Sequence, residues 1–425
     1  MIDFKKLITQ QEKFLSLLNS RGEDFTTEIK TIITLHGQHH TLLAKTEKLA
    51  HELNVKNKLI PANVSNWNQH LQILKTQKNE LQKLLQSTKS LQQQVKERLS
   101  KIPNIPHPSV PVGNDEQANK VVFTSKNSTR KSNVLHHREI AEKLHWVNWE
   151  IPAQNVQARF VIYQGNGAHL LRLLQNFCLD FHNHNNYWEV SAPNLIKGDA
   201  LWGTGQFPKM QSDCYQIAEE DLYLLPTAET SLINYYQNKL FTVEQLPQKT
   251  VGYSLCFRRE AGAAGKETRG LMRLHQFHKV EMVKLTTPET SYTELGKMVK
   301  EVEQILILLN LPYRIIELCT GDLGFASSKT YDIEVWMPSQ QKYIEISSLS
   351  NTEDFQARKL NIKFQNSLTD SKKLVHTLNG SGLALDRLFA CLLETYYDET
   401  SQNWIIPPAL KKYQERPQQF FIKLN

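Results

Sequence analysis

The first hundred residues contain two long segments in which apolar residues recur with the period of an α-helix. Between residues 32 and 53 these residues follow a 3-4 spacing. Between residues 71 and 102, two interleaved sets each repeat every seven residues: Leu74, Leu81, Thr88, Val95 and Ile102, and Leu71, Lys78, Leu85, Gln92 and Leu99. Repeats of this kind are typical of coiled-coil helices.

The segment between the two patterns, NVKNKLIPANVSNW, contains Pro61 and several Asn residues that break a helix. Two helices of similar length joined by one short break predict an antiparallel hairpin. Residues 1–101 hold 16 Lys and Arg against 9 Asp and Glu, which accounts for the whole formal charge of +7. Such a hairpin would be a dimerisation coiled coil or a basic arm that reaches a polyanion. Because a basic segment is often only a solvated surface, charge alone leaves both functions open.

A proline-rich segment, KIPNIPHPSVPVGNDEQANK, follows the second helical pattern. We therefore predict a helical arm at 1–102, a linker at 103–130 and a larger domain at 131–425. In the larger domain, β-like runs such as YDIEVWMP and QKYIEISSLS mix with helical runs such as GLALDRLFACLLETYY. The regular alternation of a parallel βαβ sheet is missing, so the sequence predicts an α+β fold with an antiparallel sheet.

Composition narrows the cellular context. No apolar run reaches the roughly 18–20 residues that cross a bilayer, and the N-terminus lacks the apolar stretch of a secretory signal. The five cysteines are scattered, with no CxxC pair. This usage argues against a zinc ribbon or a disulfide framework and suits a reducing cytoplasm.

Charged residues are concentrated in residues 256–283, CFRREAGAAGKETRGLMRLHQFHKVEMV. If both ends of this segment are strands, Arg258 and Glu260 share one face of the sheet. Arg273, Phe277 and Glu281 would then share one face of the partner strand. The glycine-spaced connection is much longer than a tight turn, which favours a functional loop. A solvent-facing surface with cross-strand ion pairs would give the same periodicity, so both interpretations stand at this point.

Three further stretches carry polar groups in apolar surroundings. LLPTAET contains Thr227 and Glu229, YIEISSLSN contains Glu345 and Ser348, and LNGSGLALDRL contains Arg387. Each stretch alone has an ordinary structural explanation. Together they supply phosphate binders, hard oxygen ligands for Mg²⁺ and polar groups for a small zwitterion.

At these segments the chain resembles the seryl-tRNA synthetases of the bacterial type. FRREAGAAGKETRGLMRLHQFHKVE is similar to the class II motif 2 of that family, LNGSGLALDR to its motif 3, and GNGAHLLRLLQNFCLDFHNHNNYWEVSAPNLI to its motif 1. PTAET, GTGQFPK, SSKTYDIEVW, EISSLSN and PNIPHPSVPVG are similar to other family segments in the same order. The resemblance spans nearly the whole chain.

The resemblance implies a class II antiparallel β-sheet flanked by helices and preceded by an antiparallel coiled-coil arm. It implies an ATP-dependent serine–tRNA ligase that first makes seryl-adenylate and pyrophosphate. The serine would then pass to the 3′ end of tRNA-Ser, and also of tRNA-Sec. The expected cofactors are ATP and Mg²⁺, with no zinc. The expected partners are serine, the long variable arm of the tRNA on the helical arm, and a second copy in a homodimer, with no membrane.

The resemblance also implies roles for individual residues in ATP binding. Arg258 would clamp the α-phosphate and the serine carboxylate, and with Arg387 would be catalytic. Glu260 would accept from the adenine amino group, and Phe277 would stack on the base opposite Arg387. Arg273 would hold the outer phosphates. The full set of implied ATP contacts is Arg258, Arg259, Glu260, Arg273, Leu274, Phe277, Glu345, Ile346, Ser347, Ser348 and Arg387.

Serine and the metal have implied contacts of their own. Glu345 and Ser348 would hold Mg²⁺. A site that hydrogen-bonds the substrate hydroxyl rejects alanine, because protein groups would be left unpaired. In the loop between Gly262 and Gly270, Lys266 and Arg269 would contact RNA phosphates. The implied serine contacts are Thr227, Ala228, Glu229, Arg258, Glu281, Asn379 and Ser381.

Three positions depart from the bacterial pattern. Ile344 stands where Arg is usual, Leu349 where Cys is usual and Asp386 where Gly is common. We expect Asp386 to be able to pair with Arg387 and alter its approach to ATP.

Three alternative functions fit the sequence less well. A non-catalytic RNA-binding paralogue should lose Arg258, Glu281, Glu345 or Arg387, yet all four are present. An amino-acid:carrier-protein ligase should lack the arm and carry a cysteine-containing zinc site. A class II synthetase for another amino acid is disfavoured by PTAE and the arm.

Overall fold

The structure is a computed structural model that describes residues 1–58, 67–126, 130–132, 134–261, 269–367 and 369–414. It divides into two compact units. The first comprises Met1–Asn19 and Glu23–Pro103, and the second comprises Ser20–Gly22 and Asn104–Asn425. Among the described residues, no helix is long and apolar enough to span a bilayer.

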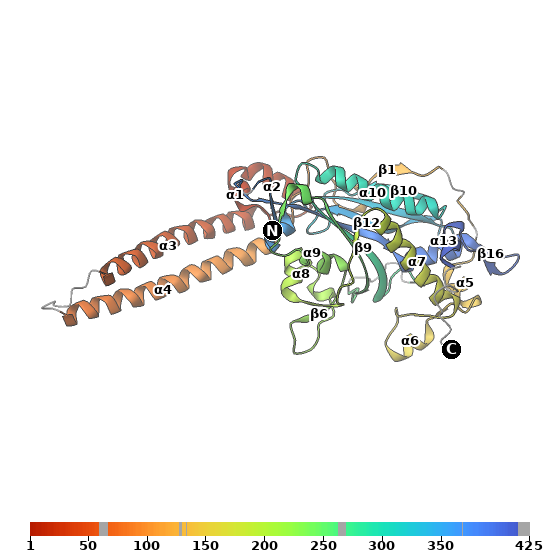
Figure 1. Ribbon diagram of the computed structural model, residues 1–425, viewed down its shortest axis with the longest axis horizontal. Helices are drawn as coiled ribbons and strands as arrows, with labels where there is room; N and C mark the ends of the chain where they lie inside the picture. Colours follow the sequence, from red (N-terminus) through yellow and green to blue (C-terminus); the bar gives the residue numbers. More distant parts are fainter. Residues whose placement is uncertain (59–66, 127–129, 133, 262–268, 368, 415–425) are drawn as a thin grey trace. The chain divides into compact units, whose positions relative to one another are not determined.

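The first unit is an antiparallel pair of long helices with two short helices at its start (Figure 1). These helices are α1 (Phe4–Thr9), α2 (Gln11–Asn19), α3 (Thr26–Lys58) and α4 (Trp67–Ser100). The cross-helix contacts run in opposite directions along α3 and α4: Glu28 with Arg98, Thr46 with Thr88, and Lys56 with Gln77. The predicted antiparallel hairpin is therefore confirmed.

The seam between α3 and α4 contains a polar pair, with Leu53 buried beyond it and apolar residues buried near the start of α3. Ile32 and Val95 are buried there. Farther along, the hydroxyls of Thr46 and Thr88 lie 3.2 Å apart, and each also donates to a carbonyl one turn earlier in its own helix. The second predicted set of seam positions is wrong at Leu71 and Leu85, which are 45% and 53% exposed, and is confirmed at Leu99, which is buried. Leu84 and Leu91 face the partner helix more closely instead, since both are partly buried.

The second unit is built on an eight-stranded sheet with the order β1-β10-β11-β12-β15-β9-β8-β4. Every neighbouring pair is antiparallel except β4 with β8, so the predicted antiparallel sheet is confirmed. β1 lies within the segment 103–130 that the sequence assigns to a linker. In sheet order the strands are Lys120–Thr124, Tyr313–Glu317, Lys329–Met337, Lys342–Asn351, His376–Ala384, Gln276–Thr286, Gln248–Phe257 and Trp188–Glu189.

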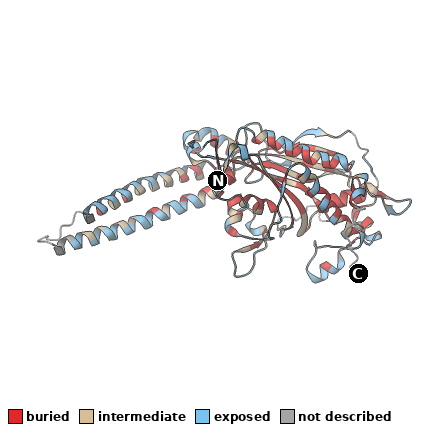
Figure 2. Ribbon diagram, viewed as in Figure 1, coloured by how far each residue is buried: buried red, intermediate tan, exposed pale blue. Residues whose placement is uncertain are grey.

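Helices cover both faces of this sheet. On β9, Val280 and Met282 belong to the core formed with α7 (Asn166–His184), α10 (Ser291–Leu308) and α12 (Leu385–Tyr396). Val283 and Leu285 pack with α9 (Ala228–Asn234) and α11 (Phe355–Leu360). Figure 2 shows buried residues concentrated in the sheet and in the helices that pack on it.

The remaining elements are short and lie around this framework. The helices are α5 (His137–Lys143), α6 (Glu150–Asn155), α8 (Gly198–Thr204) and α13 (Pro408–Gln414), with 3-10 turns at Glu116–Ala118, Gln211–Asp213 and Val243–Gln245. The strands are β2 (Val147–Asn148), β3 (Ile162–Tyr163), β5 (Leu195–Lys197), β6 (Leu222–Leu224), β7 (Leu240–Thr242), β13 (Lys363–Gln365), β14 (Lys373–Leu374), β16 (Tyr397–Asp398) and β17 (Asn403–Trp404).

The strands around the charged segment are shorter than the alternation argument assumes. β8 ends at Phe257 and β9 begins at Gln276, so Arg258, Glu260 and Arg273 lie outside both strands. Glu260 has a φ of 51°, in the left-handed region that strand residues do not adopt. The placement of these three side chains on strand faces is therefore wrong. The connecting segments, rather than strand periodicity, direct them.

Candidate active site

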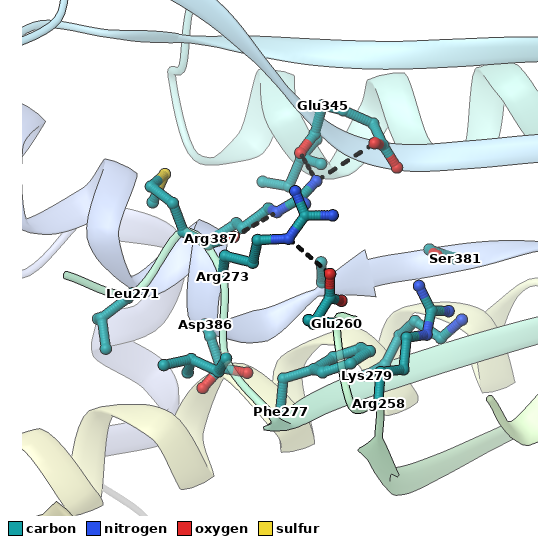
Figure 3. Close-up of a pocket in the computed structure, with 14 residues that line it drawn as sticks. Arg258, Glu260, Leu271, Arg273, Phe277, Lys279, Glu345, Ser381, Asp386 and Arg387 are labelled. Carbon is teal, nitrogen blue, oxygen red and sulfur yellow. Dashed lines mark hydrogen bonds and ion pairs between the residues drawn. The ribbon is translucent and has the colours of Figure 1, made fainter. Parts of the chain in front are cut away.

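The charged segment and three strands meet around one pocket (Figure 3). Its cavity is about 220 Å³ in volume. The walls come from the ends of the β8–β9 connection, from β9, β12 and β15, and from the start of α12. The lining residues are Arg258, Glu260, Leu271, Met272, Arg273, Leu274, Phe277, Lys279, Glu345, Ile346, Ser381, Ala384, Asp386 and Arg387.

Arg258 is held directly after the last residue of β8. Its main-chain N–H donates to the carbonyl of His275 at 2.9 Å, which extends the pairing of the two strands by one step. Its Nε donates to the carbonyl of Pro226 at 3.2 Å. The guanidinium carbon lies 5.2 Å from the centroid of the Phe277 ring, within cation–π range. The pocket therefore has a fixed positive group over an aromatic face.

Two further arginines of the pocket are paired with carboxylates. Arg273 Nε lies 2.5 Å from Glu260 Oε2. Arg387 Nη1 donates to the main-chain oxygen of Glu345 at 2.7 Å and lies 3.3 Å from its carboxylate. Arg387 Nε also donates to the carbonyl of Met272 at 3.3 Å. These bonds position both guanidinium groups in the wall of the pocket.

The expected pairing of Asp386 with Arg387 is not observed, because Asp386 has other partners. It is buried, and its carboxylate accepts from Tyr163 Oη at 2.5 Å and from the main-chain N–H of His278 at 2.6 Å. Burial and the Asp386 carboxylate raise the pKa of Tyr163 well above its usual value, so the hydroxyl keeps its proton and donates. These bonds turn the carboxylate toward β9, while the next side chain, Arg387, turns toward β12.

Leu349 and Ile344, the other two residues that differ from the bacterial pattern, are accommodated by packing. Leu349 is fully buried and pairs across the sheet with Gly380, where a Cβ would lie 2.2 Å from Leu349 Cδ2. The missing side chain of Gly380 thus makes room for the leucine. Ile344 packs against the main core, as an apolar residue at this position should.

A buried polar cluster adjoins the pocket on the same face of β9. Lys279 Nζ lies 2.5 Å from Glu281 Oε2 and donates to Thr227 Oγ1 at 2.7 Å. Across the sheet, Ser381 is the partner of Glu281 and also lines the pocket. Lys279 is not among the residues predicted from the sequence, although it alternates with Phe277 and Glu281 on one strand face. Strand periodicity could have found it.

Glu229 is a second predicted carboxylate that is buried in this cluster. Its two oxygens accept from Gln206 at 3.0 Å and from Gln356 at 2.7 Å. Burial, followed by the charge of Glu281, raises the pKa of Glu229 to about 7. Asn379 also hydrogen-bonds to Glu229, and Ala228 is buried beside it at the start of α9. Gln206 lies in GTGQFPK, one of the segments similar to the family, whereas none of the quoted segments contains Gln356.

Glu345 and Ser348 face a second, acidic cavity. Glu345 lines both this cavity and the pocket, whereas Ser348 lines only the second one, opposite Asp332 on β11. Burial and the Glu345 carboxylate raise the pKa of Asp332 well above its usual value. Crowded carboxylates and a hydroxyl are hard oxygen donors whose mutual repulsion a cation relieves, so these residues fit Mg²⁺.

Some predicted residues lie elsewhere. Ser347 is buried and donates to the main-chain oxygen of Ser381 at 2.6 Å, so it supports the pocket without lining it. Arg259 is exposed and does not line the pocket. Its main-chain N–H donates to the carbonyl of Asp213 at 2.7 Å. Lys266 lies outside the described residues, and Arg269 forms an exposed ion pair with Glu139 at 2.8 Å.

Two families match separate parts of the chain. A family described as the seryl-tRNA synthetase N-terminal domain matches residues 1–106. A family described as the tRNA synthetase class II core domain (G, H, P, S and T) matches residues 213–396.

Similar proteins cover nearly the whole chain. A serine–tRNA ligase of Mesoplasma florum is 42% identical over 97% of this chain and 98% of its own. One of Acetivibrio thermocellus is 41% identical over 97% and 98%. Among solved structures, a seryl-tRNA synthetase of Pyrococcus horikoshii complexed with ATP is 32% identical, with a TM-score of 0.88 over 97% of this chain and 98% of that one.

Proposed function

The chain belongs to the seryl-tRNA synthetase family, and we propose that it activates serine with ATP and transfers it to tRNA-Ser. One observation carries the assignment of the site. Along one face of β9, Phe277 and Lys279 line the pocket, and Glu281 lies in the buried polar cluster beside it. A nucleotide and a small zwitterion bound side by side on this face would meet at Arg258.

The pocket would hold ATP. Phe277 and the guanidinium plane of Arg387 would sandwich the adenine, Glu260 would accept from its amino group, and Arg273 would hold the outer phosphates. Leu274 and Ile346 contribute to the walls. The Arg273–Glu260 and Arg387–Glu345 pairs have to open for these roles. The solved relative in complex with ATP supports a nucleotide in this fold.

The buried cluster would hold serine. Glu281 would accept from the ammonium group, and Ser381, Thr227 and Asn379 would surround the hydroxyl. Glu229, held by two amides, would complete the polar lining beside Ala228. Thr227 is buried, and Ser381 and Asn379 are partly buried. An analogue without the hydroxyl would leave these groups unpaired, which rejects alanine strongly. Lys279 forms an ion pair with Glu281, and it would lie between the two substrates and neutralise the carboxylates around it.

In the first step, a serine carboxylate oxygen attacks the α-phosphorus of ATP. A phosphorus–oxygen bond forms, and the bond from the α-phosphorus to the bridging oxygen breaks to release pyrophosphate. Arg258 would hold the attacking carboxylate and the α-phosphate together and stabilise the negative charge of the transition state. Mg²⁺ bound by Glu345 and Ser348 would supply charge neutralisation for the phosphates.

In the second step, a ribose hydroxyl of the terminal tRNA nucleotide attacks the seryl carbonyl, and AMP leaves. The arm of residues 1–102 would bind the long variable arm of the tRNA, mostly through shape and backbone contacts. We propose a cytoplasmic homodimer that also charges tRNA-Sec. Lys266, Arg269 and Arg259 would face the acceptor end of the RNA, which gives Arg259 a function away from the pocket.

Pyrophosphate exchange with each of the twenty amino acids tests the function directly. Only serine should support exchange of labelled pyrophosphate into ATP, and only tRNA-Ser and tRNA-Sec should then be charged. A non-catalytic paralogue would show no exchange with any amino acid. A carrier-protein ligase would show exchange but no transfer to tRNA.

A further inference from the structure

We propose that His137 is a positioning residue for the ATP pocket, because it fixes the main chain of Leu271 in the pocket wall. The proposal rests on the proposed ATP-dependent activation of serine. His137 is the first residue of α5, is fully buried and does not line the pocket itself. Its effect on ATP would pass entirely through the residue that it holds.

A directed chain of hydrogen bonds starts at the pocket wall. The main-chain N–H of Leu271 donates to His137 Nε2 at 3.1 Å. Because Nε2 accepts this bond, the proton of the neutral ring is on Nδ1. Nδ1 lies 2.8 Å from Glu394 Oε1 and therefore donates to it. The surroundings thus fix both the tautomer and the orientation of the ring.

Glu394 is anchored as firmly as the ring. It is fully buried on α12 and accepts from the main-chain N–H groups of His137 at 3.0 Å and of Ser339 at 2.9 Å. The same helix carries Arg387, whose Nε donates to the carbonyl of Met272, the residue after Leu271. The wall segment is therefore tied to α12 twice. The His137 chain would set the spacing between that wall and the guanidinium of Arg387.

Gly270 shows how closely the ring approaches the wall. Its φ of +72° lies in the left-handed region, and a Cβ built on it would lie 2.1 Å from His137 Nε2. A side chain at this position would push the ring away from the Leu271 N–H. The close approach of the His137 ring to the pocket wall therefore requires glycine at position 270.

A metal site is the alternative use of this cluster. Ligand atoms of His136, His137 and Glu394 lie within 4.8 Å of one another. Both ring nitrogens of His137 are already used, by Leu271 and by Glu394. A metal would have to displace one of these bonds, so the geometry favours positioning. Metal analysis of the purified protein should find less than about one-tenth of an equivalent, and a stoichiometric metal that chelation removes with loss of ATP binding would overturn the proposal.

Two substitutions test the hydrogen bonds of the two ring nitrogens separately. In His137→Asn, the amide takes the place of Nδ1 and still donates to Glu394, but nothing accepts from Leu271. In His137→Gln, the longer side chain places an acceptor near Nε2. The Asn variant should raise the KM for ATP in pyrophosphate exchange at least about fivefold, the effect of one unpaired buried N–H group. The Gln variant should recover most of that loss.

Comparing the KM for serine with the KM for ATP distinguishes positioning of the ATP pocket from a purely structural role, because a structural role would affect both constants. The KM for serine should change less than about twofold in both variants, because the serine cluster does not touch this wall. Titration calorimetry with ATP and Mg²⁺, without serine, should show the same order of affinities. His136→Asn is the matched control, since Asn keeps the acceptor that caps α5. Its KM for ATP should equal that of the unsubstituted protein.

Equal ATP affinities of the Asn and Gln variants would overturn the proposal, as would equal losses for ATP and serine. If His137→Asn does not fold, Gly270→Ala attacks the same contact from the pocket side. An unchanged KM for ATP in Gly270→Ala would overturn the proposal as well. Failure of the unsubstituted protein to exchange pyrophosphate with serine would instead contradict the proposed function. The two failures are therefore distinguishable.

Discussion

Arg387 on α12 and Glu345 on β12 form an ion pair across the pocket, with Nη1 3.3 Å from the carboxylate. The same nitrogen donates to the main-chain oxygen of Glu345 at 2.7 Å. In the proposed function, Arg387 stacks on adenine and Glu345 binds Mg²⁺. The pair therefore holds two groups in place that separate when their ligands bind, and the main-chain bond alone can keep Arg387 near the base.

Glu345→Gln should weaken the binding of Mg²⁺ more than the binding of the nucleotide base. The Mg²⁺ concentration that gives half-maximal pyrophosphate exchange should rise at least about tenfold, the usual effect of perturbing a metal site. The carbonyl that accepts from Arg387 is retained in this variant. Exchange measured across a Mg²⁺ series checks the prediction, and an unchanged Mg²⁺ requirement would remove Glu345 from the metal site.

Arg258→Ala should lower serine-dependent pyrophosphate exchange at least about a hundredfold, because it removes charge placed for the transition state. Arg258→Lys should recover only part of this loss, since an ammonium cannot make the bidentate contacts. The neighbouring substitution Arg259→Ala should affect exchange far less, because Arg259 lies outside the pocket. Comparable losses at the two positions would contradict this placement and restore Arg259 as an ATP contact.

Glu281→Gln should raise the KM for serine by at least about tenfold while the KM for ATP changes little, because only the serine ammonium loses its charged acceptor. The exchange reaction measured with each substrate varied in turn gives both constants. Equal effects on serine and ATP would argue against a serine contact at this position.

Glu229 should make serine binding depend on pH near neutrality. Its pKa is raised to about 7, so the folded site favours the protonated carboxyl group. The contribution of this group to the stability of the folded protein is fully present below its ordinary pKa and is lost as the pH rises through about 7. The KM for serine of the unsubstituted protein should therefore change between about pH 6 and pH 8, and Glu229→Gln should flatten this part of the profile. An identical profile in the variant would exclude Glu229 as the titrating group.

His182 should limit stability in acid. It is fully buried on α7, and burial lowers its pKa to about 4. Its contribution to stability is present above the ordinary pKa of a histidine and is lost as the pH falls from about 6.5 toward 4. Thermal unfolding of His182→Leu between these pH values should show a weaker loss of Tm than the unsubstituted protein. The exposed His145→Asn serves as control and should leave the slope unchanged.

Removing the outer part of the arm should separate RNA binding from activation. Replacing residues 34–93 with a short turn keeps the Glu28–Arg98 pair and the apolar seam at Ile32 and Val95. Serine-dependent exchange should be retained, whereas the KM for tRNA-Ser should rise at least about tenfold as basic contacts are lost. Unchanged charging of tRNA would show that the arm has another function.

The sequence alone determined that two long helices pair in antiparallel, that an antiparallel sheet follows, and which polar stretches belong together. These features follow from local properties: helical and strand periods, proline breaks, and motifs that resemble one family. The two-residue strand period also places Lys279 on the same face as Phe277 and Glu281.

Only the tertiary structure decided which partner each side chain has. Leu84 and Leu85 are equally apolar, but only Leu84 is partly buried, whereas Leu85 is exposed. Asp386 binds His278 and Tyr163 rather than its neighbour Arg387, because β9 and β3 bring donors to it from distant positions. The same holds for Gln356 at Glu229 and for His137 at Leu271. Periodicity fixes the face on which a side chain lies, whereas its hydrogen-bond partner depends on which distant segment the folded core brings to that face.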